Sequence, residues 1–287
     1  MENFTPYSAA IGGVLLGISA TLLLWLNGRI AGISGIFGGA TRLTSTDRQW
    51  RILFLLGLIF GGALWWQMMG PTFVPRSGFS VPLLVGAGIL VGFGTRLGNG
   101  CTSGHGVCGL SRRSGRSLAA TATFFRCAGH NFCDAARHWR WDMKGNIVAL
   151  VSGTMFGLGL AISEMTNPEK VLGFLDIFGR WDPSVAFVMG GAVAVTALTF
   201  RYVKALPKPL FAARFEVPTS TAIDRPLLVG AVLFGIGWGT AGFCPGPAIA
   251  SITMGSSEPP IFLLALLVGN YLAGRWQTAG STVGQTA

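Results

Sequence analysis

Long apolar blocks recur along the whole sequence, and they restrict its possible folds more than any other feature. The seven clearest blocks are residues 9–26, 52–69, 81–93, 147–162, 185–200, 226–241 and 261–273. A helix needs about 20 residues to cross roughly 30 Å of hydrocarbon, and several of these blocks are shorter. The blocks therefore predict membrane-spanning helices, several of them tilted or broken.

The composition indicates the same class of protein. Of the 287 residues, 51% are hydrophobic and 11% are charged, whereas about 25% are charged in a typical soluble domain. So few charges cannot cover a surface that faces water. We therefore expect an all-α, polytopic integral membrane protein in contact with the lipid bilayer. Its 43 glycines favour close helix contacts and irregular backbone within a bundle.

The net charge of +10 comes from Lys and Arg residues in short loops beside the apolar blocks. This distribution indicates membrane topology and not a nucleic-acid partner. The basic loops are residues 42–51, 112–116 and 201–225, and we expect them in the cytoplasm. The loops at residues 71–80 and 163–182 carry less net positive charge, so we expect them outside.

The sequence contains an internal repeat. PLLVGA at residues 82–87 returns unchanged at residues 226–231, and a glycine-spaced apolar stretch then leads to Cys101 in one copy and Cys244 in the other. We therefore expect two membrane repeats, residues 1–140 and 141–287. The loop charge changes sign between the halves, which predicts inverted repeats with broken or re-entrant helices, as in transporters whose sites lie between the repeats.

The two cysteine segments carry the candidate site. Residues 98–116 are too polar and glycine-rich for an ordinary span, and prolines follow Cys244 where proline suits the first turn of a helix. Cys101 and Cys244 are thus expected at loop-to-helix junctions, where unpaired N–H groups favour an anion. The other candidate contact and motif residues are Gly100, Thr102, Ser103, Gly104, His105, Gly106, Gly242, Pro245, Gly246 and Pro247.

The chemistry of these residues suits a small anion with sulfur character. A thiol can donate or accept a weak hydrogen bond, or exchange sulfur with a sulfane substrate. We interpret Cys101 and Cys244 as substrate-pathway residues because they hold matching places in the repeat, and Cys108 as a packing residue. His105 is either an ordinary polar residue or a substrate contact. The arginines within residues 112–116 are interpreted as topology anchors.

Two motifs, GNGCTSGHGVCGLSRRS from residue 98 and GFCPGPA in the second half, resemble the paired signatures of the YeeE/YedE family of sulfur-transport membrane proteins. The resemblance covers nearly the whole chain. It implies uptake of thiosulfate or a related sulfur compound, handed on by hydrogen bonding past Cys101 and Cys244. Some members of that family are one fused chain and others two half-size chains. Some carry a further cysteine near the first broken segment, whereas residues 27–32 here have none.

The apolar pattern breaks at residues 125–144, which hold two of the three histidines and two of the five cysteines. Members of the resembled family are expected to have an apolar helix there. Three interpretations remain open: a metal site, a polar loop, or a local shift of reading frame. The metal ligands would be Cys127, His130, Cys133 and His138, whose spacing matches no recognised zinc motif. Charged residues at this density are not tolerated facing lipid.

These observations favour a multi-pass transporter of a bacterial inner membrane that takes up thiosulfate or a related anion. A cytoplasmic sulfur-carrier protein is a candidate acceptor. The alternatives are a carrier for another small anion, and a membrane sulfurtransferase that forms a persulfide on Cys101 or Cys244. The sequence has no soluble catalytic domain and no clear constellation of cysteine and base. We therefore expect no enzyme, catalytic residue, cofactor, metal ion or nucleic-acid partner.

Overall fold

The computed structural model describes residues 4–41, 48–76, 78–98, 100–112, 114–119, 143–179, 181–217 and 223–283. The long helices are α1 (Pro6–Asn27), α3 (Arg48–Met69), α4 (Val81–Gly98), α6 (Met143–Ile162), α8 (Ser184–Ala205), α9 (Arg225–Ala241) and α11 (Glu258–Val283). The short helices are α2 (Ile33–Ala40), η1 (Ser103–Gly109), α7 (Pro168–Leu175) and α10 (Pro245–Ala250). Across these described ranges the protein is all-α.

Each apolar block of the sequence lies within one long helix. Helices α1, α3, α4, α6 and α8 are long and apolar enough to cross a membrane, and α9 is equally apolar but has 17 residues. Many large apolar side chains on the long helices are exposed, such as Ile11, Phe60 and Leu264. A surface of this kind is stable in lipid and not in water. The chain is therefore a multi-pass membrane protein.

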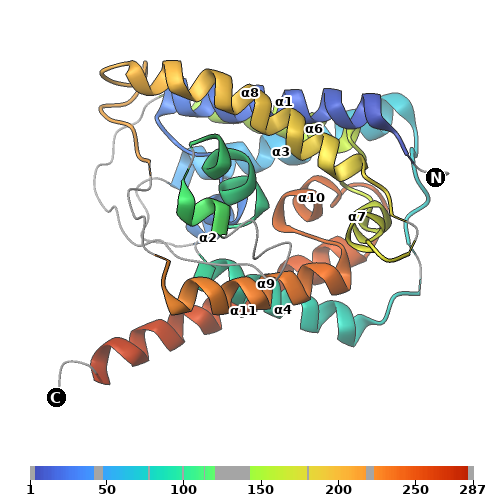
Figure 1. Cartoon of the computed structure of the whole chain (residues 1–287). Coiled ribbons are helices and arrows are strands. Elements are labelled where there is room, and N and C mark those ends of the chain that lie inside the picture. Colours follow the sequence, from blue (N-terminus) through green and yellow to red (C-terminus); the bar gives the residue numbers. More distant parts are fainter. Residues whose placement is uncertain are drawn as a thin grey trace.

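The long helices form two layers with the short helices between them (Figure 1). Helices α1, α3, α6 and α8 pack together in one layer, and α4 packs between α9 and α11 in the other. Helix α10 contacts α3, α6 and α11, while η1 contacts α8 and α2. The short helices thus fill the centre of the protein, where irregular backbone is shielded from lipid.

The two halves are inverted and intertwined. Helices α1 to α4 correspond in order to α6 to α9, and α10 corresponds to η1. The last residue of α1 meets the first turn of α6, where Asn27 Nδ2 donates to the carbonyl of Gly145 at 2.7 Å. Corresponding helices therefore run in opposite directions, and partners are exchanged, since α1 packs on α8 and α3 packs on α6. The expected boundary between residues 140 and 141 lies outside the described residues.

Glycines allow the closest of these contacts. A Cβ atom added to Gly57 of α3 would lie 2.3 Å from the carbonyl oxygen of Leu150 in α6. One added to Gly157 of α6 would lie 2.1 Å from the carbonyl oxygen of Leu58 in α3. The two backbones therefore touch directly, which is how helices associate in lipid without a hydrophobic driving force.

The two ends of the bundle carry different loops. At the first end, which we call the basic end, Arg29 pairs with Glu216 and stacks on Trp50. At the second, the opposite end, the loop containing Arg76 lies beside Thr166, after α6. This grouping agrees with the loop charges, which placed residues 71–80 with residues 163–182. Which end faces the cytoplasm stays a prediction.

The polar stretch at residues 125–144 lies outside the described residues, except for Met143 and Lys144, which begin α6. The metal site, the polar loop and the shifted reading frame therefore remain hypotheses.

Candidate functional site

The two candidate cysteines meet at the centre of the protein. The side chain of Cys101 is 1% exposed and that of Cys244 is 4% exposed. Thr102 Oγ1 donates a long hydrogen bond of 3.9 Å to Cys244 Sγ. Because Cys101 directly precedes Thr102, it lies in the same buried region as Cys244. The repeat thus delivers one cysteine from each half to a common buried cluster.

Cys244 owes its position to the chain reversal between α9 and α10. Gly242 ends α9 with φ 75°, and a Cβ atom there would lie 2.5 Å from the carbonyl oxygen of Pro168. This left-handed, crowded position therefore requires glycine. Cys244 is the N-cap of α10 and Pro245 starts the helix, as the sequence predicted. The N–H of Gly246 lies near the thiol of Cys244 without completing a capping hydrogen bond.

Cys101 lies at the matching junction between α4 and η1. Its Sγ atom is 3.1 Å from Ser103 Oγ, which accepts a hydrogen bond of 3.3 Å from the N–H of Ile33. Because that bond uses a lone pair of Ser103, the hydroxyl proton can point to the thiol or to a ligand. The start of α2 thus supports the site from a third segment.

Glycines bring these three segments together. Gly32 and Gly104 face each other, since a Cβ atom on Gly32 would lie 3.8 Å from the Cα of Gly104. A Cβ atom on Gly246 would lie 3.6 Å from Ile33. The backbones of η1 and of the segment before α2 therefore approach closely at these two glycines.

His105 is placed away from the meeting point of the two halves. Its Nε2 is 3.4 Å from the carbonyl oxygen of Gly98, and its Nδ1 is 3.4 Å from Ser117 Oγ. A carbonyl only accepts, so this contact requires a proton on Nε2. Gly100 makes room for this ring, because a Cβ atom there would lie 2.4 Å from it. These contacts give His105 a supporting role in the first motif.

The remaining motif residues support the backbone of the two short helices. Gly106 lies against Met189, and the carbonyl of Pro247 accepts a 2.9 Å hydrogen bond from the N–H of Ser251. Since η1 has seven residues and α10 has six, their dipoles are small and confined to a turn. The thiols and hydroxyls therefore supply more of the polar groups that could bind a ligand than the helix ends do.

The sequence did not reveal that the start of α2 and the residues before it border the site. The N–H of Ala31 lies near the thiol of Cys108, which is 1% exposed. Ser34, in the first turn of α2, has a buried hydroxyl without a hydrogen-bond partner among the described residues. The glycines flanking residues 29–31 were the available signal, since they mark a broken segment.

Comparison with known proteins gives related sequences but no matching structure. Residues 144–279 match a family described as "Family of unknown function (DUF6691)". A "Probable transporter" of Xylella fastidiosa strain Temecula1 is 43% identical over 129 residues, covering 45% of this chain and 87% of the relative. A second "Probable transporter" of that strain is 46% identical over 114 residues, covering 40% of this chain and 83% of the relative. No solved structure matches.

Proposed function

The chain belongs to the family of these probable transporters, and we propose that it takes up thiosulfate or a related small sulfur-containing anion through the buried cysteine cluster. The multi-pass fold and the relatives' names support membrane transport. The two motifs that resemble those of the YeeE/YedE family support the choice of substrate.

One observation carries this proposal: equivalent cysteines of two inverted halves meet in the buried centre, with the Thr102 hydroxyl against the Cys244 thiol. Substrate sites of repeat transporters lie at this kind of interface. The pairing of both cysteines with hydroxyl groups suits a ligand that passes between the halves.

The cluster offers several weak hydrogen-bond donors to a passing anion. An anion that leaves water loses its hydration and must find donors inside the protein. The thiols of Cys101 and Cys244, the hydroxyls of Thr102 and Ser103, and nearby backbone N–H groups supply them. Weak donors hold the anion long enough to pass and still let it leave, as conduction requires. No covalent bond needs to form or break.

The direct test is uptake of labelled thiosulfate by bacterial cells that lack other sulfur importers. Cells that produce the wild-type chain should accumulate the label, and cells with the double variant C101A/C244A at equal membrane abundance should not. Normal uptake by the double variant would contradict the proposed pathway. Competition with unlabelled sulfate, sulfite and thiosulfate would rank the anions and identify a carrier for a different one.

A sulfurtransferase is the second candidate, because the thiols of Cys101 and Cys244 lie in the same buried region and could react with the substrate. The thiolate of Cys101 or Cys244 would attack the outer sulfur of thiosulfate, form a persulfide and release sulfite. This step needs an activated thiolate, yet the ring nitrogens of His105 face Gly98 and Ser117. Mass spectrometry after exposure to thiosulfate separates the two functions, since a persulfide favours the enzyme and unmodified thiols favour the carrier.

The proposal includes an orientation and an acceptor. We place the protein in a bacterial inner membrane with its basic end in the cytoplasm, following the distribution of positive charge. A cytoplasmic sulfur-carrier protein would then receive the anion or its sulfur at the basic end. Co-purification of a thiol-bearing carrier in the presence of thiosulfate would support this acceptor.

A further inference from the structure

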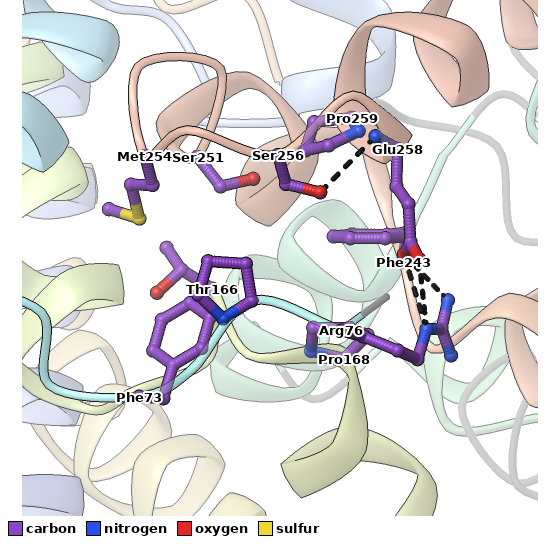
Figure 2. A pocket seen from close by; sticks show the side chains of 11 residues that line it. Phe73, Arg76, Thr166, Pro168, Phe243, Ser251, Met254, Ser256, Glu258 and Pro259 are labelled. Carbon is purple, nitrogen blue, oxygen red and sulfur yellow. Dashed lines mark hydrogen bonds and ion pairs between the residues drawn. The ribbon is translucent and has the colours of Figure 1, made fainter. Parts of the chain in front are cut away.

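A narrow pocket lies at the opposite end of the bundle, beside the segment that precedes Cys244 (Figure 2). It has room for about one water molecule. Its wall includes Phe243, which directly precedes Cys244, and the apolar side chains of Phe73 and Met254. The loop before α4, the start of α7 and the segment between α10 and α11 all contribute to the lining. Both halves of the protein therefore form this pocket.

An ion pair closes one side of the pocket. Arg76 Nη2 is 2.9 Å from Glu258 Oε2, and Arg76 Nε is 3.2 Å from the same oxygen. Arg76 Nη2 also donates to the carbonyl of Ala241 at 3.3 Å, near the end of α9. The side chains of Arg76 and Glu258 are 12% and 10% exposed. The almost buried guanidinium thus contacts Ala241, which lies three residues before Cys244 in the sequence.

We propose that this pocket is the entry site for the transported oxyanion, with Arg76 as the residue that recognises its charge. This inference rests on the proposed function and adds a binding site to it. Before an anion binds, the guanidinium of Arg76 is hydrogen-bonded to the carboxylate of Glu258. An arriving oxyanion takes the place of that carboxylate on Arg76 and then passes Phe243 to Cys244.

The chemistry of the pocket fits a small oxyanion. A guanidinium presents parallel N–H donors that match the oxygen atoms of a carboxylate or of a sulfur oxyanion equally well. Thr166, Ser251 and Ser256 add hydroxyls to the lining. The apolar side chains around them exclude water, which strengthens the attraction between the guanidinium and an anion. An anion is therefore recognised by charge and oxygen geometry before it reaches the thiols.

A second ion pair lies at the basic end. Asp224 directly precedes α9 and Arg116 lies after η1, while Arg76 lies in the loop before α4 and Glu258 begins α11. Arg116 and Asp224 also pair, with Arg116 Nη1 at 3.8 Å from Asp224 Oδ1 at the basic end. Each end of the bundle thus has an arginine–carboxylate pair that joins a residue of the first half to a residue of the second half.

The test compares E258Q, which frees Arg76, with the double variant R76Q/E258Q, which removes both charges. The double variant avoids a lone buried carboxylate, which would destabilise the fold. E164Q is the matched control, because Glu164 pairs with Lys170 at the same end without lining the pocket. Each purified protein is titrated with sodium thiosulfate and sodium sulfate at constant ionic strength, with the thermal unfolding temperature as the readout.

We expect E258Q to reach half of its anion-induced stabilisation at about tenfold lower anion concentration than the wild type. R76Q/E258Q should lose that stabilisation, and E164Q should behave as the wild type. An unchanged titration for R76Q/E258Q, or equal curves for E258Q and E164Q, would overturn the entry site. Uptake assays separate the two proposals: if the wild type imports no thiosulfate but its anion titration depends on Arg76, the proposed substrate fails and the site stands.

Discussion

Thr102 of the first half and Cys244 of the second half lie within 3.9 Å of each other, hydroxyl oxygen to sulfur, in the interior of the protein. The contact joins residues that are 142 positions apart in the sequence. It exists because Cys101 and Cys244 follow equivalent helices, α4 and α9, that run in opposite directions. The buried centre is therefore shared equally by the two repeats, and changes in either half should affect the same pathway.

Replacing Thr102 by valine should slow uptake while leaving the fold intact. Valine has nearly the same shape but cannot donate to Cys244 or to an anion, and one such bond contributes about 0.5–1.5 kcal/mol. We expect uptake at low thiosulfate concentration to fall about fivefold. T240V is the control, because the exposed hydroxyl of Thr240 donates a hydrogen bond within its own helix, to the carbonyl of Ile236. Equal uptake by both variants would remove Thr102 from the pathway.

Replacing Cys101 or Cys244 by alanine should abolish thiosulfate uptake, because each change removes a soft donor and acceptor at little cost in volume. C108A should keep much of the activity, although Cys108 is as buried as Cys101. Membrane abundance and initial uptake rates should be measured together. A loss in C108A equal to that in C101A would make Cys108 a third pathway residue.

Alanine at Gly157 should destabilise the protein, since its Cβ atom would lie 2.1 Å from the carbonyl oxygen of Leu58. Separating α3 from α6 to relieve such overpacking costs about 1–3 kcal/mol. G86A is the control, because a Cβ atom at Gly86 of α4 meets nothing within 4 Å. Thermal unfolding in detergent should show a lower midpoint for G157A alone. Equal midpoints would mean that α3 and α6 do not touch as closely as described.

The long helices could be predicted from the sequence, because lipid requires apolar side chains on every exposed turn. The eight-residue helices α2 and α7 could not, since buried helices of that length carry no hydropathy signal of their own. Cys244 could be placed at a helix start because prolines follow it. The positions of Ala31 beside Cys108 and of Ile33 beside Ser103 could not be foreseen. Ala31 and Ile33 contribute backbone N–H groups there and no reactive side chain.

The loop charges predict that the basic end faces the cytoplasm. Phe178 is fully exposed in the loop after α7, and Lys208 is exposed in the loop after α8. In a C127S/C133S background, a membrane-impermeant thiol reagent added to intact cells should label F178C and not K208C. Permeabilised cells should label both. Labelling of K208C alone in intact cells would reverse the orientation.

Residues 125–144 are predicted to result from a shifted reading frame. Helix α11 covers α4, where a Cβ atom on Gly92 would lie 2.0 Å from the carbonyl oxygen of Leu266. The matching face of α9 exposes Leu228 and Ile236, and the repeat predicts an apolar helix against it. Resequencing the DNA and translating the other frames should reveal a largely apolar stretch. If neither frame gives one, a genuine polar loop is the better interpretation.

The exchange of helix partners between the halves affects how the protein can be made. As the chain leaves the ribosome, α1 and α3 enter the membrane before α8 and α6, the helices on which they pack, have been synthesised. The glycine-lined faces of α1 and α3 must therefore contact lipid or other segments in the bilayer until the second half is synthesised. For the same reason, a protein with the topology of one half alone would reach this architecture only by pairing with a second chain.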